Sequence, residues 1–312
     1  MIHLSVIIPI YNEEGNIPLL YERLTTVASG ITDQYELIFI NDGSKDNSFQ
    51  IIKSLSIKDK AIRFIDFSKN FGHQIAVSAG LDNCKGECVV IIDADLQDPP
   101  ELILELYAKW KSGNEVVFAR RKERKGESWL KKKTATWFYD LLNRLTNVNI
   151  PKEAGDFRII DRKIVDIIKS MPEKNKFLRG QIAWAGYNQT DVEYIRQERH
   201  SGKTNYTFAR MFQLAFDGIT SFSNLPLRLA TWMGFLVSAV AFVVIIYTLY
   251  TKYILQSAEK GWSSMMVSIL FIGGVQLICL GIIGEYIGRI LDNVRDRPLY
   301  LIKETNIEKA GK

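Results

Sequence analysis

Two long stretches without a charged residue constrain the fold of this 312-residue chain more than any other feature. They cover residues 229–251 and 261–284, and a short connector separates them. Each is longer than the roughly 20 residues that a helix needs to cross a hydrocarbon layer about 30 Å thick. We therefore predict two antiparallel transmembrane helices. Buried helices of a soluble core are the alternative reading of the same pattern.

Basic residues at the two ends of this hairpin predict its orientation. Positively charged flanks stay on the cytoplasmic side of a membrane. We therefore expect a protein of the cytoplasmic membrane, with its N-terminal region and its C-terminal tail both in the cytosol. The residues concerned are Arg210 and Arg228 before the first stretch, and Arg289, Arg295, Arg297 and Lys303 after the second.

Short apolar runs alternate with helical patterns over about the first 120 residues. The composition, 47% hydrophobic and 24% charged, excludes a disordered chain. This βαβ rhythm predicts an α/β fold with an open, largely parallel sheet covered by helices on both faces. The predicted strands are residues 5–10, 36–40, 62–67, 88–92 and 116–119, and the predicted helices are residues 16–29, 46–57, 73–84 and 99–112.

Polar residues follow three of the predicted strands directly. The clusters are Tyr11-Asn12-Glu13, Asn41-Asp42-Gly43 and Asp93-Ala94-Asp95. In open α/β sheets, ligands bind beyond the carboxyl ends of the strands. We therefore expect the three clusters to converge on one ligand site.

Asp93 and Asp95 give the main chemical signal. In an extended chain they would point to the same side. Two neighbouring carboxylates repel each other unless a cation or a proton lies between them. A divalent cation, Mg²⁺ or Mn²⁺, whose other ligands are phosphate oxygens would remove that repulsion. The alternative is that one aspartate caps a helix while the other is solvated. The chain has no P-loop lysine motif and no GxGxxG in its first βα turn, which disfavours an ATPase or a dinucleotide enzyme.

Several motifs together resemble a known family. SVIIPIYNEE, FINDGSKDNS, DFSKNFGH and DADLQDPP are similar to segments of family 2 glycosyltransferases with the GT-A fold. AGDFRIIDR, LPLR at the entry to the first apolar stretch, GEYIGRI and VRDRPLY resemble the polyprenyl-phosphate sugar transferases within that family. The resemblance implies a GT-A catalytic domain at residues 1–205, amphipathic interfacial helices at 206–226, a transmembrane hairpin at 227–290 and a cytosolic tail at 291–312.

The same resemblance implies an activity. It points to metal-dependent, inverting transfer of glucose from UDP-glucose to undecaprenyl phosphate at the cytoplasmic face of the membrane. The alternatives are another donor (GDP-mannose or a modified UDP-pentose) or a non-catalytic subunit that binds or transports nucleotide sugars. A processive polysaccharide synthase is disfavoured because residues 181–184 lack the arginine of the QxxRW motif.

Roles for individual residues follow from the resemblance as well. Asp156 is implied as the catalytic base or the organiser of the acceptor phosphate, with Asp95 and Arg158 as further catalytic residues. Asp42 and Gly43 could instead form only a turn and a helix cap. The residues implied for the nucleotide sugar are Pro9, Tyr11, Glu13, Asp42, Asp66, Asp93 and Gln97, and those implied for the metal are Asp93, Asp95 and Gln97.

A basic segment is expected to bind the acceptor phosphate. Residues 120–133 contain eight Lys or Arg and two Glu, a net charge of +6, whereas the whole chain carries +5. Next to membrane helices, lipid headgroups are better partners for it than nucleic acid. A solvated charge run is the alternative. The expected acceptor-phosphate residues are Arg121, Lys132, Arg158, Arg199 and Lys203, the last as a substitute for a family lysine that is absent here.

Glycines line the second apolar stretch and its exit. They are Gly273, Gly274, Gly281, Gly284 and Gly288. Small residues allow membrane helices to approach closely. We therefore also expect a homo-oligomer.

Overall fold

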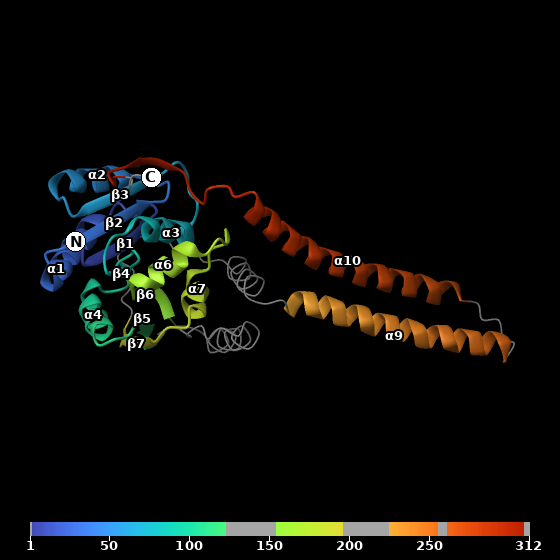
Figure 1. Ribbon diagram of the computed structural model, residues 1–312. Helices are drawn as coiled ribbons and strands as arrows, with labels where there is room; N and C mark the ends of the chain where they lie inside the picture. Colours follow the sequence, from blue (N-terminus) through green and yellow to red (C-terminus); the bar gives the residue numbers. More distant parts are fainter. Residues whose placement is uncertain (1, 123–153, 196–224, 255–260, 309–312) are drawn as a thin grey trace. The chain divides into compact units, whose positions relative to one another are not determined.

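A computed structural model describes residues 2–122, 154–195, 225–254 and 261–308 of the chain. The chain divides into two compact units (Figure 1). One comprises Met1–Gln213 together with Arg297–Lys312, and the other comprises Leu214–Asp296. The last residues of the chain therefore belong with the N-terminal unit. The predicted interfacial helices at 206–226 lie almost entirely outside the described residues.

The first unit is built on one eight-stranded sheet with the order β7-β5-β6-β4-β1-β2-β3-β8. The central strands are runs of β-branched and other apolar residues, which is typical of strands buried on both faces. The strands are β1 Leu4–Ile10, β2 Tyr35–Asn41, β3 Ile62–Phe67, β4 Cys88–Ile91, β5 Val116–Arg121, β6 Ala154–Asp161, β7 Gln189–Tyr194 and β8 Ile302–Thr305.

The prediction of a largely parallel sheet is confirmed, with two antiparallel insertions. Strands β1, β2, β3 and β4 pair in parallel, and so do β5 and β7. Strand β6 runs antiparallel between β4 and β5, and β8 runs antiparallel along β3. Strands β1–β5 lie close to the five predicted ones, whereas β6, β7 and β8 are not predicted from the sequence.

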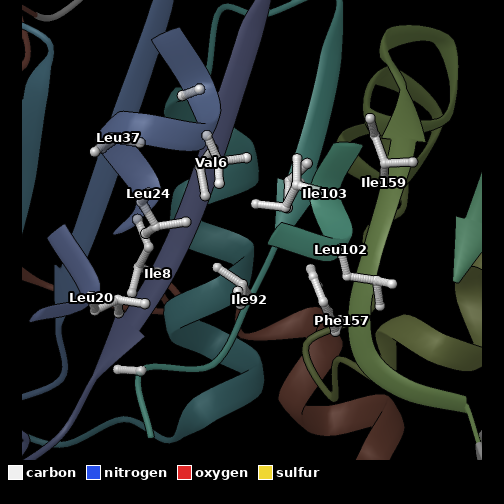
Figure 2. Close-up of a cluster of buried hydrophobic side chains, with 14 of the residues drawn as sticks. Val6, Ile8, Leu20, Leu24, Leu37, Ile92, Leu102, Ile103, Phe157 and Ile159 are labelled. Carbon is white, nitrogen blue, oxygen red and sulfur yellow. The ribbon is translucent and has the colours of Figure 1, made fainter. Parts of the chain in front are cut away.

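Helices cover both faces of the sheet. Helices α1, α2 and α4 pack on one apolar core, part of which Figure 2 shows, and α3, α6 and α7 pack on the other. Alternation along the strands divides the apolar side chains between the two cores. On β1, Val6 and Ile8 face the first core and Ile7 faces the second. The helices are α1 Ile17–Ile31, α2 Ser48–Lys58, α3 His73–Asn83, α4 Ile103–Lys111 after a 3-10 turn at Pro100–Leu102, α6 Arg162–Ser170 and α7 Leu178–Trp184.

The second unit contains two long helices, α9 Leu225–Tyr253 and α10 Trp262–Val294. Segments Leu225–Tyr247 and Phe271–Val294 are long and apolar enough to cross a membrane. Their large apolar side chains are exposed, for example Phe235 at 67% and Leu277 at 71%. Water does not favour so much exposed apolar surface, whereas lipid does. These helices associate the protein with a membrane.

Candidate active site

Strand register brings two distant motifs to one edge of the sheet. Because β6 is antiparallel to β4, its first residues lie where β4 ends. Ile91 of β4 pairs with Arg158 of β6. Continuing this register by two residues places Asp93 opposite Asp156. The DADLQ and GDFR motifs, more than sixty residues apart in the chain, therefore meet at one site.

The Asp93–Asp95 segment is a turn, and this corrects the expectation of an extended chain. Ala94 and Asp95 lie in the turn, and Leu96 has a φ of +58°. Asp95 is buried, and its Oδ1 accepts a hydrogen bond of 3.2 Å from the Gln97 backbone N–H. The two carboxylates nevertheless interact, because the charge of Asp95 is one of the causes that raise the pKa of Asp93.

Asp93 lies in a strongly negative, partly buried environment. Burial raises its pKa; the His73 charge opposes this, the charges of Asp156, Asp98 and Asp95 add to it, and the result is a pKa of about 6. Among the described residues, its Oδ1 is buried without a hydrogen-bond partner. An acidic oxygen of this kind suits a cation. Within the described parts of the chain, no three His, Cys, Asp or Glu side chains gather as a metal cage. An ion at Asp93 and Asp95 would therefore share its coordination with substrate oxygens, as Mg²⁺ commonly does.

His73, the first residue of α3, lies between the two motifs. Its Nε2 is 3.6 Å from Asp93 Oδ1 and 3.4 Å from Asp156 Oδ2. Burial lowers the pKa of His73, but the negative charges of Asp93 and Asp156 outweigh it and raise the pKa to about 9. The imidazole is therefore a cation at neutral pH. From the sequence, His73 is expected only to cap or to pack near the nucleotide pocket, and its contacts with Asp93 and Asp156 are not predicted.

Arg179, on α7, is the second residue that the sequence analysis missed. Its Nε donates a hydrogen bond of 2.7 Å to Asp156 Oδ1. Burial raises the pKa of Asp156, but the charge of Arg179 and the contacts with His73 hold it well below its usual range. Asp156 is thus a carboxylate held between two cations. No pattern in the sequence around Arg179 indicated this contact.

Arg158 is buried on the same strand. Its Nη2 donates to the Gly155 carbonyl at 2.7 Å and its Nε donates to the Asp156 carbonyl at 3.3 Å. Burial lowers its pKa, and the nearby Asp156 charge opposes that shift. In this structure Arg158 supports the backbone that carries Asp156.

Arg121, at the end of β5, contacts Tyr194, which forms a buried pair with Asp98. Its Nε lies 3.4 Å from the hydroxyl of Tyr194, and that hydroxyl donates a very short hydrogen bond to Asp98 Oδ1. The Arg121 and Arg179 charges also act on each other. The predicted acceptor residue Arg121 therefore lies near the Asp156 end of β6.

The loops after β1 and β2 are bonded to each other. The Asn12 backbone N–H donates to Ser44 Oγ at 3.0 Å, and the Lys45 N–H donates back to Asn12 Oδ1 at 2.8 Å. The Glu13 N–H donates to Ser48 Oγ at 2.9 Å. These contacts bring the first two predicted clusters together. Of the residues predicted for the nucleotide, Pro9 is buried in β1, Tyr11 is 40% exposed and Glu13 accepts from Asn16 at 2.6 Å.

Asp42 caps the loop before α3. Its two carboxylate oxygens accept hydrogen bonds from the backbone N–H groups of Phe71 at 2.6 Å and Gly72 at 3.0 Å. Burial raises its pKa, and these two bonds lower it. Asp42 therefore makes capping contacts, as the alternative reading of Asp42 and Gly43 expected. Because Gly72 directly precedes His73, these contacts also help to position His73.

Asp66 lies at the end of β3, which is one strand further from Asp93 than β2, the strand that precedes Asp42. Its Oδ1 accepts a hydrogen bond of 2.7 Å from Asn41, and its Oδ2 is 3.8 Å from Lys303 Nζ. These contacts link it to β2 and β8. Lys132, Arg199 and Lys203, predicted for the acceptor phosphate, lie outside the described residues.

Comparison with protein families assigns both units. The model "Glycosyl transferase family 2" matches residues 5–168, and "GtrB C-terminal hairpin" matches residues 225–290. The first match covers the strands that carry Asp42, Asp93 and Asp156. The second match covers α9 and most of α10.

Individual relatives match almost the whole chain. The glycosyltransferase YkcC of Bacillus subtilis is 50% identical over 304 residues, covering 97% of this chain and 94% of its own. A prophage bactoprenol glucosyl transferase homolog of Escherichia coli is 42% identical, covering 96% of this chain and 98% of its own. The bactoprenol glucosyl transferase of Shigella phage SfV is also 42% identical over the same shares.

Among solved structures, glucosyl-3-phosphoglycerate synthase from Mycobacterium tuberculosis, in complex with Mn²⁺, UDP and phosphoglyceric acid, matches 70% of this chain and 76% of its own. It is 17% identical, with a TM-score of 0.48. The family models and the full-length relatives show that this chain is an enzyme of glycosyl transferase family 2 with a GtrB-type C-terminal hairpin.

Proposed function

We propose that the enzyme transfers glucose, with inversion, from UDP-glucose to undecaprenyl phosphate at the cytoplasmic face of a membrane. One observation carries the proposal. The carboxylates of Asp93 and Asp156 come together from β4 and β6, with His73 within 3.6 Å of both. Full-length relatives at 42% identity that are named bactoprenol glucosyl transferases support the donor sugar and the lipid acceptor.

The reaction needs no nucleophile from the enzyme. A phosphate oxygen of the acceptor attacks the anomeric carbon, the bond from that carbon to the diphosphate oxygen breaks, and UDP leaves with the electron pair. In-line attack inverts the anomeric configuration. The enzyme must therefore hold two anionic substrates side by side, which requires positive charge at the site.

Asp93, Asp95 and Gln97 are the proposed holders of a divalent cation. When bound, such an ion neutralises charge that develops on the departing diphosphate. The buried, unbonded Oδ1 of Asp93 fits this role. Either Mg²⁺ or Mn²⁺ would suit these oxygen ligands.

Asp156 is the proposed catalytic carboxylate. Arg179 and His73 fix its orientation and keep it ionised. An ionised carboxylate at this place can orient the acceptor phosphate through a shared cation or proton. Arg158 keeps the Asp156 backbone in place and, with Asp95, completes the proposed catalytic set.

The acceptor phosphate is proposed to bind on the basic side of the site. Arginine suits this task because its planar guanidinium can contact two phosphate oxygens at once. Arg121 and Arg158 are the described members of this set, and Lys132, Arg199 and Lys203 complete it. The nucleoside is proposed to lie over the ends of β1 and β2, near Pro9, Tyr11, Glu13, Asp42 and Asp66.

The hairpin is proposed to span the membrane twice, with both chain ends in the cytosol. Arg295, Arg297 and Lys303 follow α10, and lysine and arginine concentrate on the cytoplasmic side. This topology would keep the lipid-linked phosphate near the catalytic unit. Glycines on α10 support close helix contacts in a homo-oligomer.

The test is transfer of labelled glucose from UDP-glucose to undecaprenyl phosphate in detergent. We expect labelled lipid with Mg²⁺ or Mn²⁺ and none with excess chelator. A parallel set with GDP-mannose and UDP-pentoses tests the donor. Labelled lipid from another donor alone would replace the glucose proposal, and binding of UDP-sugar without transfer to any lipid would favour a non-catalytic subunit. Equal product with chelator would disprove the cation site.

A further inference from the structure

The C-terminal strand is joined to the edge of the catalytic sheet, with one irregularity in the pairing between Asp66 and Phe67. Strand β8 pairs antiparallel with β3, and Figure 1 shows this last segment (red) running beside β3. Further bonds extend the pairing at both ends. The Ser68 N–H donates to the Leu301 carbonyl at 3.0 Å, and the side chain of Asn306 bonds Phe64 N–H at 2.7 Å and the Ile62 carbonyl at 2.9 Å. The chain after α10 is therefore part of the catalytic unit.

Tyr300 forms the end of this segment that is nearest to the site. Its ring stacks on Phe67, with centroids 5.1 Å apart and planes at 24°. Its hydroxyl donates a hydrogen bond of 3.0 Å to Asp82 Oδ2 on α3. Phe67 in turn packs edge-on against Phe71 at 5.5 Å. Tyr300 thus contacts the end of β3 directly through Phe67, reaches the β3–α3 connection through Phe67 and Phe71, and bonds the C-terminal end of α3 through Asp82.

That connection, residues 68–72, leads directly to His73. On its inner side it is held by the end of β2. Asp42 accepts the Phe71 and Gly72 N–H groups, and a Cβ on Gly43 would lie 2.5 Å from the Lys69 carbonyl carbon. On its outer side it is held by Leu301 and by the stacked rings of Tyr300 and Phe67. The loop is therefore held from both sides, and the outer side is the one that the C-terminal segment supplies.

We propose that the C-terminal strand is a positioning element of the active site, with Tyr300 as its main residue: it holds loop 68–72 so that His73 lies between Asp93 and Asp156. The VRDRPLY segment thereby gains a role apart from the membrane. Small displacements at a reacting centre are costly, because a shift of about 1 Å can reduce turnover by about 100-fold. The catalytic part of the proposal rests on the proposed function, whereas the structural part does not.

The test compares two variants of the full-length protein at opposite ends of β8. Tyr300→Ala removes the ring that supports loop 68–72, and Asn306→Ala removes the two bonds to β3 at the other end. The first readout is hydrogen exchange of the Ser68, Phe71 and Gly72 amides, which needs no substrate. We expect it to rise by at least about tenfold in Tyr300→Ala and to stay near the wild-type rate in Asn306→Ala.

The second readout is turnover. We expect kcat to fall by at least about tenfold in Tyr300→Ala, with a smaller change in the KM for the donor, while Asn306→Ala loses thermal stability with kcat almost unchanged. Tyr300→Phe keeps the stacked ring and should restore most of kcat. If the Tyr300→Ala variant does not fold, the Tyr300→Leu variant is used in its place. Leucine keeps much of the apolar volume but cannot stack on Phe67.

Two results would overturn the proposal. One is wild-type exchange in loop 68–72 of a folded Tyr300 variant. The other is an equal loss of kcat in the Tyr300 and Asn306 variants at equal loss of stability, because that indicates stability alone. A failed glucose-transfer assay with altered exchange would contradict the proposed function and leave the positioning role intact.

Discussion

The two units of this enzyme use the same kinds of apolar residue with opposite results. In the catalytic unit, Ile38 of β2 is fully buried, and helices of the same chain cover both faces of the sheet. In the hairpin, Ile245 of α9 is 56% exposed. The catalytic unit supplies its own nonpolar surroundings, whereas the hairpin requires a lipid environment. The polar site lies in the catalytic unit, where strands and helices packed on the sheet hold its carboxylates and arginines.

The largest expected effect lies in the catalytic unit. Asp156→Asn removes the charge that Arg179 and His73 hold, and we expect turnover to fall about 100-fold to 10,000-fold. Affinity for UDP should stay nearly intact, and so should recovery in the membrane fraction. Glucose transfer and UDP titration measure the two effects.

Asp161→Asn, at the other end of β6, is the matched control. The Asp161 side chain caps α6 through the Lys163 N–H. We expect little change in stability, because asparagine caps a helix about as well as aspartate does, and little change in turnover. Loss of UDP affinity in Asp156→Asn would move that residue into the donor site.

The next effect tests the hairpin. Leu236→Arg places a charge at the middle of the span Leu225–Tyr247. We expect it to cost about 2.5 to 3.5 kcal/mol of insertion free energy, which lowers the share of protein in washed membranes. Leu236→Ala should remain in the membrane. An unchanged share for the arginine variant would mean that α9 does not span a bilayer.

A matched pair of isoleucines compares the two units directly. We expect Ile38→Ala to reduce the free energy of unfolding of the catalytic unit by about 2 to 5 kcal/mol, because it leaves a cavity in the core. Ile245→Ala should leave the same unfolding transition unchanged, since its side chain lies outside that core. Urea titration in detergent measures both. An equal loss of unfolding free energy in the Ile38→Ala and Ile245→Ala variants would contradict the division into two units.

The smallest expected effect is the pH dependence of cation binding. The pKa of Asp93 is raised to about 6, so in the ligand-free enzyme this carboxyl becomes protonated as the pH falls below that value. Protons then compete with the cation, and affinity for Mn²⁺ in the presence of UDP should fall by about tenfold per pH unit well below pH 6. The Asp93→Asn variant should bind Mn²⁺ weakly at every pH. Constant wild-type affinity between pH 7 and pH 5 would contradict Asp93 as a ligand.

Much of the architecture could be predicted because it depends on local patterns. Short continuous apolar runs and helical spacings of three to four identified β1 to β5 and helices α1 to α4 within a few residues. The missed strands had weaker signals. In β6 the apolar Phe157 and Ile159 alternate with charged Asp156 and Arg158 over only four residues, and the four residues of β8, IKET, carry no strand pattern.

By itself, the sequence determined the family, the α/β class, the apolar hairpin and the acidic motif after β4, because each is written in residues close together in the chain. Only the tertiary structure decided which distant groups meet. The antiparallel register of β6 places Asp156 opposite Asp93, the β3–α3 loop brings in His73, and α7 supplies Arg179. These contacts depend on strand order and helix packing, which join residues whose separation along the chain has no period that a sequence pattern could reveal.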